Sequence, residues 1–514
     1  MVSNRVKQIV IFDRQVPASQ ISKEASSIAG WLLDKNVREN DVVALLMWND
    51  VPIFSIAEAC GLVGAFLVPL NWHLTRPELD YILADSGAKV LFGHSHLLAK
   101  AGLAGDETCS VVAVATSREI VASFPGASES CLDNNNWTDW HDLLAHEPCA
   151  GAVRANTRSS IFYTSGTTGK PKGVVRQVPS DDISRAARQR SAKGLGLDTA
   201  GQGLLNLVCC PLYHSAPFAH AMMSWNAGFD IVLMPRFDPQ EFLNLAVRFR
   251  ATHSLLVPTM FSRLLALPEA DRATFDASHF AAVAHGAAPC PIPVKQRMIE
   301  WWGPVIREYY AGTETGVLTA STSQEWMAHP GTVGRTVDAA DVRAIDDAGV
   351  ELPRGQSGRL IARTESTQYF HYLGRGGPPV IEGWEGYVWL GDIGYVDPDG
   401  FVFLTDRSSD IVVAGGVNIY PAEIELELAT IAGVADSAVF GVPVPDLGEG
   451  IVAVVERVAG SNLDEATIIK ALSLKLARYK LPRRVVFVEK LPREESGKLR
   501  KRLLRSEYAS IFSN

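Results

Sequence analysis

The chain has 514 residues, a formal net charge of -9 at pH 7 and 47% hydrophobic residues. The length suggests more than one domain, and the composition is ordinary for a globular protein. The negative net charge excludes a global basic field that would attract nucleic acid or anionic lipid. We therefore expect no nucleic-acid partner, and we expect local cations to meet any polyanionic ligand.

The N-terminal part of the chain alternates helical patterns with short β-branched runs. Residues Ile21–Leu33 are predicted to form an amphipathic helix, and Val42–Trp48 a buried strand. The apolar runs AKVLFG, IVLMP, SLLVPT and AAVAHG are further strand candidates. Strands that alternate with helices predict an α/β fold whose parallel sheets are covered on both faces.

The most apolar long stretch is Val51–Leu70, which contains Glu58, two glycines and two prolines. It is barely long enough to cross a bilayer, so we predict a buried helix and turn, with no transmembrane segment. The start MVSNRVKQIV lacks the pattern of a secretory signal. Seven scattered cysteines without CxxC spacing favour reduced thiols and a cytoplasmic location, with Cys209 and Cys210 packed in the core.

From about Asp338 the pattern changes to strands joined by tight turns. The DPDG sequence at Asp397–Gly400 places Pro and Gly where a β-turn needs them. Its two acids could suggest calcium, but no further ligand follows at loop spacing, so a turn is favoured. Tyr420-Pro421 followed by AEIELELA predicts a helix start, and the remaining residues suffice for one small α+β domain.

One run, YTSGTTGKPKGVV from Tyr163 to Val175, concentrates hydroxyls, glycines and lysines. Such a loop turns backbone N–H groups and hydroxyls toward phosphate oxygens, and lysine adds point charge. The run fails the ordinary P-loop pattern, because only two residues separate Gly166 from Gly169 and Pro171 follows Lys170. A surface linker is the alternative, but linkers rarely follow an apolar approach such as SSIFYT. The run therefore predicts a phosphate loop of another kind.

This loop resembles the signature loop of the adenylate-forming superfamily, which includes acyl-CoA synthetases, peptide-synthetase adenylation domains and beetle luciferases. Further segments resemble the family's motifs in the family's order: YYAGTET, WLGDIGY, TDRSSDIVVAGGVNIYPAEIE and LPREESGKLRKRLL. The segments PLYHSAP and GAAPCP are most similar to the corresponding segments of acyl-CoA synthetases that act on fatty, bile-acid or steroid-like carboxylates.

The resemblance implies an ATP-dependent acid–thiol ligase that works in two half-reactions. A carboxylate attacks the α-phosphorus of ATP to give an acyl-adenylate and pyrophosphate, and the thiol of coenzyme A then displaces AMP. The implied architecture is an α/β N-terminal domain of stacked sheets with a small β-rich subdomain over residues 1–406. A hinge follows at 407–410, centred on Ser409, and then a small mobile α+β domain over 411–514.

The resemblance also assigns the nucleotide site. Its β- and γ-phosphate cradle comprises Thr164, Ser165, Gly166, Thr167, Thr168, Gly169, Lys170 and Lys172. Its adenine and ribose site comprises Gly286, Ala287, Ala288, Tyr310, Ala311, Gly312, Thr313, Asp392 and Arg407. Glu314 is assigned to Mg²⁺, because a carboxylate beside a triphosphate needs a cation between them. The alternative for Asp392 and Arg407 is a structural ion pair, and for Glu314 a surface position.

Lys498 in SGKLRK is the cation predicted to support adenylation, by pairing with the substrate carboxylate and the α-phosphate. The alternative, a basic patch for nucleic acid, fits poorly with the net charge. Gly415 and Gly416 are predicted to leave room for the pantetheine arm of coenzyme A. His214 is predicted at the acyl and thiol entrance, with a core histidine as the alternative. No zinc spacing and no catalytic-triad signal accompany it.

Three departures from the family pattern stand out. Val175–Val178 replaces a common Thr-His, Leu390 precedes Gly-Asp where threonine is common, and Ser409 occupies the hinge. One alternative is therefore an enzyme with one half-reaction attenuated. Another loads an acyl carrier protein, and a third is a nonenzymatic nucleotide- or acyl-binding protein. The acyl pocket is expected from residues 214–228, 258–263 and 285–290, whose small and apolar character suggests a hydrophobic carboxylic acid.

Overall fold

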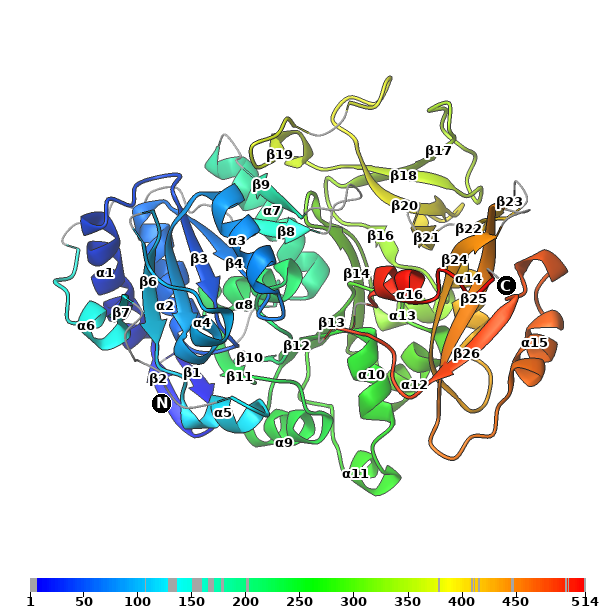
Figure 1. Ribbon diagram of the computed structural model, residues 1–514, viewed down its shortest axis with the longest axis horizontal. Helices are drawn as coiled ribbons and strands as arrows, with labels where there is room; N and C mark the ends of the chain where they lie inside the picture. Colours follow the sequence, from blue (N-terminus) through cyan, green and yellow to red (C-terminus); the bar gives the residue numbers. More distant parts are fainter. Residues whose placement is uncertain are drawn as a thin grey trace.

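The computed structural model describes residues 7–106, 108–127, 136–149, 160–164, 171–176, 180–199, 203–377, 380–407, 410, 412–414, 417–444, 448–494, 497 and 499–512. Figure 1 shows a blue sheet at one end, a large green and yellow sheet in the middle and an orange sheet at the other end. Helices pack around and between these sheets, so the predicted α/β class is confirmed.

The N-terminal sheet is parallel and five-stranded, in the order β4 (Phe66–Pro69), β3 (Val42–Leu46), β5 (Ala88–His94), β6 (Ser110–Val114) and β7 (Trp137–Asp139). Along β3, Val43 and Leu45 enter one hydrophobic core while Val42 and Ala44 enter another. Successive side chains of a strand point to opposite faces, so both faces of this sheet are covered, as predicted.

The helices of this region are α1 (Ala18–Asp34), α2 (Pro52–Val63), α3 (Arg76–Ser86), α4 (Ser95–Ala101), α5 (Arg118–Ser123) and α6 (Trp140–Leu144). The predicted helix Ile21–Leu33 lies inside α1, and the apolar stretch Val51–Leu70 forms buried α2 and then strand β4. Gly64, with φ +78°, ends α2 in the left-handed conformation that glycine tolerates.

The central sheet has 13 strands. Its order is β17 (Asp341–Ile345), β18 (Gly358–Arg363), β20 (Val388–Val396), β21 (Phe401–Arg407), β16 (Gly334–Thr336), β15 (Gly316–Ser321), β14 (Ile306–Gly312), β13 (Ala282–His285), β12 (His253–Leu256), β10 (Leu205–Val208), β11 (Asp230–Leu233), β1 (Gln8–Ile11) and β2 (Arg14–Pro17). The strands from β14 to β1 run parallel, and the remaining pairs are antiparallel. The antiparallel end is the predicted β-rich part, and the DPDG turn joins β20 to β21.

Helices cover both faces of the parallel strands. They are α7 (Asp181–Leu195), α8 (Ser215–Asn226), α9 (Pro239–Phe249), α10 (Pro258–Leu265), α11 (Glu269–Ala273) and α12 (Ile292–Trp302); α13 (Ser323–Ala328) and η1 (Thr367–Tyr369) follow. Ile231 and Leu233 of β11 share a core with Val43 and Leu45 of β3, so the two sheets are stacked through common helices. Cys209 and Cys210 are buried in a second hydrophobic core of the central sheet, separate from the one shared with β3, as predicted.

A third sheet is antiparallel and three-stranded, in the order β19 (Phe370–Tyr372), β9 (Lys172–Arg176) and β8 (Phe162–Thr164). In β8 and β9, Thr164 pairs with Lys172, so the predicted phosphate loop connects two adjacent strand ends. Residues Ser165–Lys170 of that loop lie outside the described residues.

The C-terminal part has its own sheet, made of β22 (Val412–Ala414), β23 (Val417–Ile419), β24 (Val434–Val444), β25 (Gly448–Arg457) and β26 (Arg484–Val488). Its helices are α14 (Pro421–Leu428), α15 (Glu465–Ser473), η2 (Arg478–Lys480) and α16 (Lys501–Glu507). Two separate hydrophobic cores cover the two faces of β24 and β25. Tyr420 occupies the N-cap position of α14, so the predicted helix start is confirmed. The hinge at 407–410 stays a prediction, because Ser408 and Ser409 lie outside the described residues.

Within the described part of the chain, no helix is long and apolar enough to cross a membrane. The described cysteines, Cys60, Cys109, Cys149, Cys209, Cys210 and Cys290, are all free thiols.

Burial of histidine makes the stability of the central sheet depend on pH. His220 of α8 is buried against Asn206 of β10, with Asn206 Nδ2 and His220 Nδ1 3.1 Å apart. Burial, together with a smaller contribution from the neighbouring His253, lowers the pKa of His220 to about 3. The folded state therefore holds neutral His220 at a pH where the unfolded chain is already protonated.

We predict that the free energy of unfolding falls as pH decreases from about 6.5 toward 3. Because the unfolded chain binds the extra proton, the loss approaches about 1.4 kcal/mol per pH unit for each such histidine. Urea unfolding at several pH values measures this slope. His220→Gln, which cannot take up the proton, should have a shallower slope, and equal slopes in both proteins would contradict the prediction.

Candidate active site

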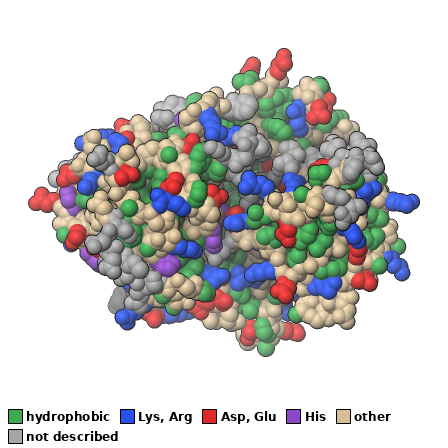
Figure 2. All heavy atoms as spheres, viewed as in Figure 1, with side chains coloured by type: hydrophobic (Ala, Val, Ile, Leu, Met, Phe, Trp, Pro, Cys, Tyr) green, Lys and Arg blue, Asp and Glu red, His purple; other side chains and the backbone are tan. Residues whose placement is uncertain are grey.

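A cleft of about 3450 Å³ lies between the central sheet and the C-terminal part and contains most of the predicted site. Figure 2 shows Lys and Arg side chains near the hollow at the centre of this face. The predicted residues that line the cleft are Thr164, Lys172, His214, Gly286, Ala287, Ala288, Tyr310, Ala311, Gly312, Thr313, Glu314 and Asp392. Tertiary structure therefore gathers residues that are more than two hundred positions apart in the sequence.

The predicted adenine and ribose residues come from different strands of the central sheet and meet at the cleft. Tyr310 of β14 donates a hydrogen bond of 2.6 Å from its hydroxyl to Oδ2 of Asp392 on β20, and both side chains are buried. A Cβ on Gly286 would lie 2.6 Å from the carbonyl oxygen of Tyr309, so only glycine fits there. Ala287 has φ +68°, which turns the loop after β13 toward the cleft. The side chain of Arg407 lies outside the described residues, and only its backbone pairing with Asp392 is seen.

The turn that carries Glu314 joins β14 to β15, and hydrogen bonds with buried side chains fix its backbone. Buried Thr315 accepts a hydrogen bond from the backbone N–H of Gly312 at 3.2 Å. Arg190 of α7 is 1% exposed and donates to the carbonyl oxygens of Thr315 and Val317. A 3.0 Å ion pair with Glu365 compensates its charge. Sequence reasoning missed Arg190, because an arginine within a helix carries no signal of burial.

Glu314 itself is half-buried and faces the cleft. Its Oε1 accepts a 3.2 Å hydrogen bond from the hydroxyl of Tyr372 on β19. The Nζ of Lys172 lies 5.3 Å from the centre of the Tyr372 ring. Tyr372 thus connects the predicted metal carboxylate to the described end of the phosphate loop. A carboxylate here, with the Thr164 hydroxyl lining the same cleft, fits a hard cation such as Mg²⁺.

His214 precedes α8 as its N-terminal capping residue. The next residue, Ser215, places its hydroxyl 3.4 Å from the hydroxyl of Thr313. The His214 ring lies 4.3 Å from that of Tyr213, and it is half-buried at the cleft wall. The structure therefore brings His214 close to the Glu314 turn, while its role at the acyl and thiol entrance stays a prediction.

Lys498 lies outside the described residues, but both of its neighbours are described. Gly497, with φ +78°, packs against the Thr259 side chain at the start of α10. Its carbonyl oxygen accepts a 2.8 Å hydrogen bond from Arg493, which forms a bidentate ion pair with Asp436. The segment around Lys498 therefore reaches from the C-terminal sheet to the wall of the cleft. Gly415, Gly416 and Ser409 also lie outside the described residues.

A buried ion pair lies next to the loop at Gly286–Ala288, which is predicted to contact adenine. The sequence analysis did not predict this pair. Lys295 of α12 lies 2.5 Å from Oε2 of Glu308 on β14, and Nε2 of His285 lies 3.8 Å from the same carboxylate oxygen. Burial lowers the pKa of Lys295 and raises that of Glu308, while their mutual attraction opposes both shifts. His285 directly precedes Gly286, so this cluster forms part of the floor of the site.

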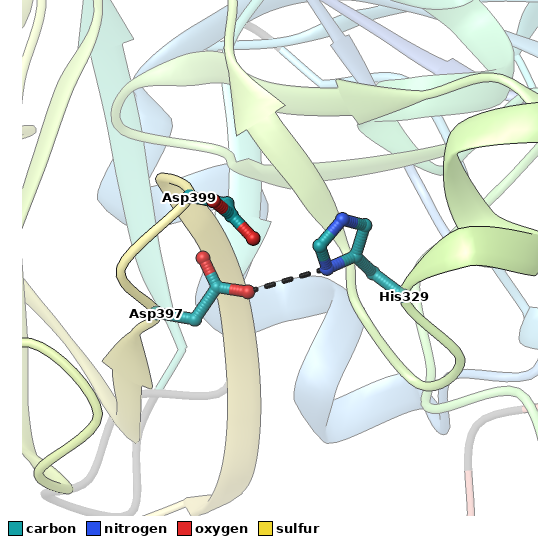
Figure 3. A group of neighbouring side chains, drawn as sticks. All are labelled: His329, Asp397 and Asp399. Atoms are coloured by element: carbon teal, nitrogen blue, oxygen red, sulfur yellow. Dashed lines mark ion pairs between the residues drawn. The ribbon is translucent and has the colours of Figure 1, made fainter.

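One group of described residues has the spacing of metal ligands: His329, Asp397 and Asp399 (Figure 3). His329 Nδ1 lies 3.4 Å from Asp397 Oδ2, and the His329 ring stacks on Phe401. Asp397 Oδ1 accepts a 2.8 Å hydrogen bond from the backbone N–H of Phe401, which closes the DPDG turn. An ion pair and a turn account for the group, in agreement with the predicted turn.

Two family models match the chain. Residues 4–368 match the family model described as AMP-binding enzyme, and residues 423–498 match that described as AMP-binding enzyme C-terminal domain. The chain is 30% identical to the long-chain-fatty-acid–CoA ligase FadD13 of Mycobacterium tuberculosis (strain ATCC 25618 / H37Rv), over 97% of this chain and 94% of that protein.

A second relative is the fatty acid–[acyl-carrier-protein] ligase ScoC of Streptomyces coeruleorubidus, 30% identical over 96% of this chain and 92% of that protein. Among solved structures, ATP-bound MatB from Rhodopseudomonas palustris superposes with a TM-score of 0.81 and 28% identity. The superposition covers 100% of this chain and 98% of that one. The likeness extends over the N-terminal and C-terminal parts alike.

We predict that Lys295→Met lowers the free energy of unfolding by about 3 kcal/mol or more, because it leaves Glu308 buried without its cation. The double variant Lys295→Met/Glu308→Leu should recover most of this loss, because no buried charge remains. Urea unfolding followed by tryptophan fluorescence measures both. Lys193→Met, which breaks the exposed pair with Asp338, is the matched control and should change little. Equal losses in the single and double variants would contradict the prediction.

Proposed function

The chain belongs to the AMP-binding enzyme family, and on that premise we propose that it is an ATP-dependent acyl-CoA ligase for hydrophobic carboxylic acids. The observation that carries the proposal is that Tyr310, Asp392, Glu314 and Gly497 face one cleft. This arrangement brings residues of the predicted nucleotide site and the neighbour of the predicted cation Lys498 together.

In the proposed adenylation step, a carboxylate oxygen of the acid bonds to the α-phosphorus of ATP, and the bond to the pyrophosphate oxygen breaks. The main difficulty is the repulsion between a carboxylate and a polyanion, which cations at the site must offset. Tyr310 and the loop at Gly286 would hold adenine, and Asp392 would accept hydrogen bonds from ribose hydroxyls. Lys172 and the phosphate loop would hold the β- and γ-phosphates.

Glu314 is the residue proposed to hold Mg²⁺, with its position set by Tyr372. When bound, Mg²⁺ would supply positive charge that offsets the negative charge of the phosphates. Arg190 donates a hydrogen bond to the carbonyl oxygen of Thr315 and so helps to fix the turn that carries this carboxylate.

Lys498 is proposed to approach the acid carboxylate and the α-phosphate from the C-terminal part. Gly497 already lies against Thr259, so the segment can deliver a cation to the cleft. For the second step, the thiol of coenzyme A attacks the acyl carbon and AMP leaves. Withdrawal of Lys498 and approach of Gly415 and Gly416, by rotation about Ser409, would clear the path for the thiol. Two efficient half-reactions are part of this proposal.

The acid is proposed to be hydrophobic, because the cleft near α8 and α10 has an apolar wall comprising Ala219, Met222, Met223, Phe237, Val257 and Met260. Coenzyme A is the proposed acceptor. A carrier protein is the second candidate, because the relative ScoC is named for transfer to an acyl carrier protein. A cytoplasmic location is proposed from the reduced thiols of the described cysteines.

A panel of carboxylic acids tests the function directly. We expect pyrophosphate release that depends on ATP and acid, followed by AMP release that depends on coenzyme A, with aliphatic or ring-containing acids preferred over short charged ones. Parallel reactions with coenzyme A and with holo-carrier protein identify the acceptor. Absence of acid-dependent pyrophosphate exchange across the whole panel would overturn the proposed function.

We also predict that Glu314→Gln lowers the adenylation rate by about a hundredfold or more, because a charge that acts at the transition state is lost. The Mg²⁺ concentration for half-maximal rate should rise as well. Thioester formation from supplied acyl-adenylate should be affected far less, since no triphosphate takes part. Glu300→Gln, an exposed carboxylate on α12, is the control. An unchanged Mg²⁺ dependence would show that Glu314 does not hold the cation.

A further inference from the structure

Arg176 occupies a position in the cleft that the sequence motifs leave without a role. It ends β9, four residues after Lys172, and side chains at 172, 174 and 176 share one face of the strand. Arg176 is half-buried and lines the cleft with Lys172, Glu314 and Tyr372. In the sheet, Arg176 pairs with Phe370, and the next residue on that face, Val174, pairs with Tyr372.

Its guanidinium lies at the end of the Glu314 turn. A Cβ built on Gly316 would be 3.4 Å from Nη1 of Arg176 and 3.8 Å from Nη2 of Arg190. Two guanidinium groups therefore approach the same glycine. Burial lowers the pKa of Arg176, the charge of Arg190 lowers it further, and the charge of Glu314 raises it. Arginine stays protonated at neutral pH, so the two like charges coexist in this site.

The two arginines have different surroundings. Arg190 is fully buried, pairs with Glu365 and donates to the carbonyl oxygens of Thr315 and Val317, so it acts on the turn. Arg176 is more exposed and faces the open cleft beside Glu314. Arg176 therefore adds a positive charge and a planar set of N–H donors to the part of the cleft that Lys172 and Glu314 also line.

We propose that Arg176 is a phosphate-binding residue that holds the β- and γ-phosphates of ATP and the departing pyrophosphate. This proposal rests on the proposed function. The planar guanidinium donates two parallel hydrogen bonds to phosphate oxygens, which a lysine cannot do. During adenylation the bond from the α-phosphorus to the bridging oxygen breaks, and the electron pair stays on pyrophosphate. Arg176 stabilises that growing negative charge.

The test is calorimetric binding of MgATP, pyrophosphate and AMP to the wild type and to Arg176→Gln. The dissociation constants of ATP and pyrophosphate should rise about tenfold or more, the usual effect of losing a hydrogen bond to a charged group. The dissociation constant of AMP, which lacks both phosphates, should change less than about twofold. Arg176→Lys should lie between the two proteins, because it keeps the charge and loses the fork.

Two controls separate binding from folding. Arg248→Gln removes an exposed arginine that pairs with Asp13 and should bind all three ligands like the wild type. The melting temperature of ligand-free Arg176→Gln should stay close to that of the wild type, because the residue is half-buried at the end of a strand and glutamine keeps a polar side chain there. A lower melting temperature with equal weakening of ATP and AMP would assign Arg176 a structural role and overturn the proposal.

Unchanged affinities of Arg176→Gln for ATP and pyrophosphate would also overturn it. Failure of the proposed function gives a different result, because the wild type itself would then show no acid-dependent exchange of pyrophosphate into ATP. A wild type that catalyses exchange, together with a variant that retains full exchange and full ATP affinity, would reject the role of Arg176 alone.

Discussion

The position of the Glu314 carboxylate is the constraint on which the rest of the site depends. A carboxylate that is proposed to hold Mg²⁺ beside a triphosphate needs a fixed position, and a short turn between two strands does not provide this alone. Arg190 supplies the missing support from a buried position by donating to the carbonyl oxygens of Thr315 and Val317. Its own charge is compensated by Glu365, which comes from the segment after β18. Tyr372 then fixes one oxygen of Glu314 from a different sheet. Helix α7, the central sheet and the three-stranded sheet thus converge on one side chain.

Charged residues around the proposed nucleotide site are likewise held in specific local arrangements. The Arg190–Glu365 ion pair, the buried Lys295–Glu308 pair and Lys172 lie around one cleft in a protein whose net charge is -9. The cations are local, as the composition required. Ion pairs on the floor serve geometry, because both charges are already compensated. Cations that line the cleft can serve a ligand, because they face the space that a polyanion would occupy. This distinction separates Arg190 from Arg176, although both approach Gly316.

The C-terminal part contributes in a different way. Its sheet packs on two hydrophobic cores that are both made of residues from the C-terminal part. The Arg493–Asp436 ion pair holds the segment that ends at Gly497, and Gly497 lies against Thr259 of α10. A rigid small unit that presents one loop to the cleft suits a reaction in which a cation is needed for one step and unwanted in the next.

Much of this protein follows from its sequence alone. Hydrophobic patterns located α1, β3, β5 and the central strands β11, β12 and β13, since such patterns reflect which faces must leave water. Ordered motifs identified the family and assigned Tyr310, Glu314 and Asp392 to its predicted nucleotide site, because such motifs keep residue types at fixed spacing. Tertiary structure alone decided that Tyr310 bonds to Asp392, that Tyr372 orients Glu314, and that Arg176 and Arg190 meet at Gly316. These partners come from strands and helices far apart in the chain, and pairing across a fold of this size depends on packing that no local pattern encodes. A helical arginine such as Arg190 reads as solvated in sequence, and only the packing of α7 against β15 buries it.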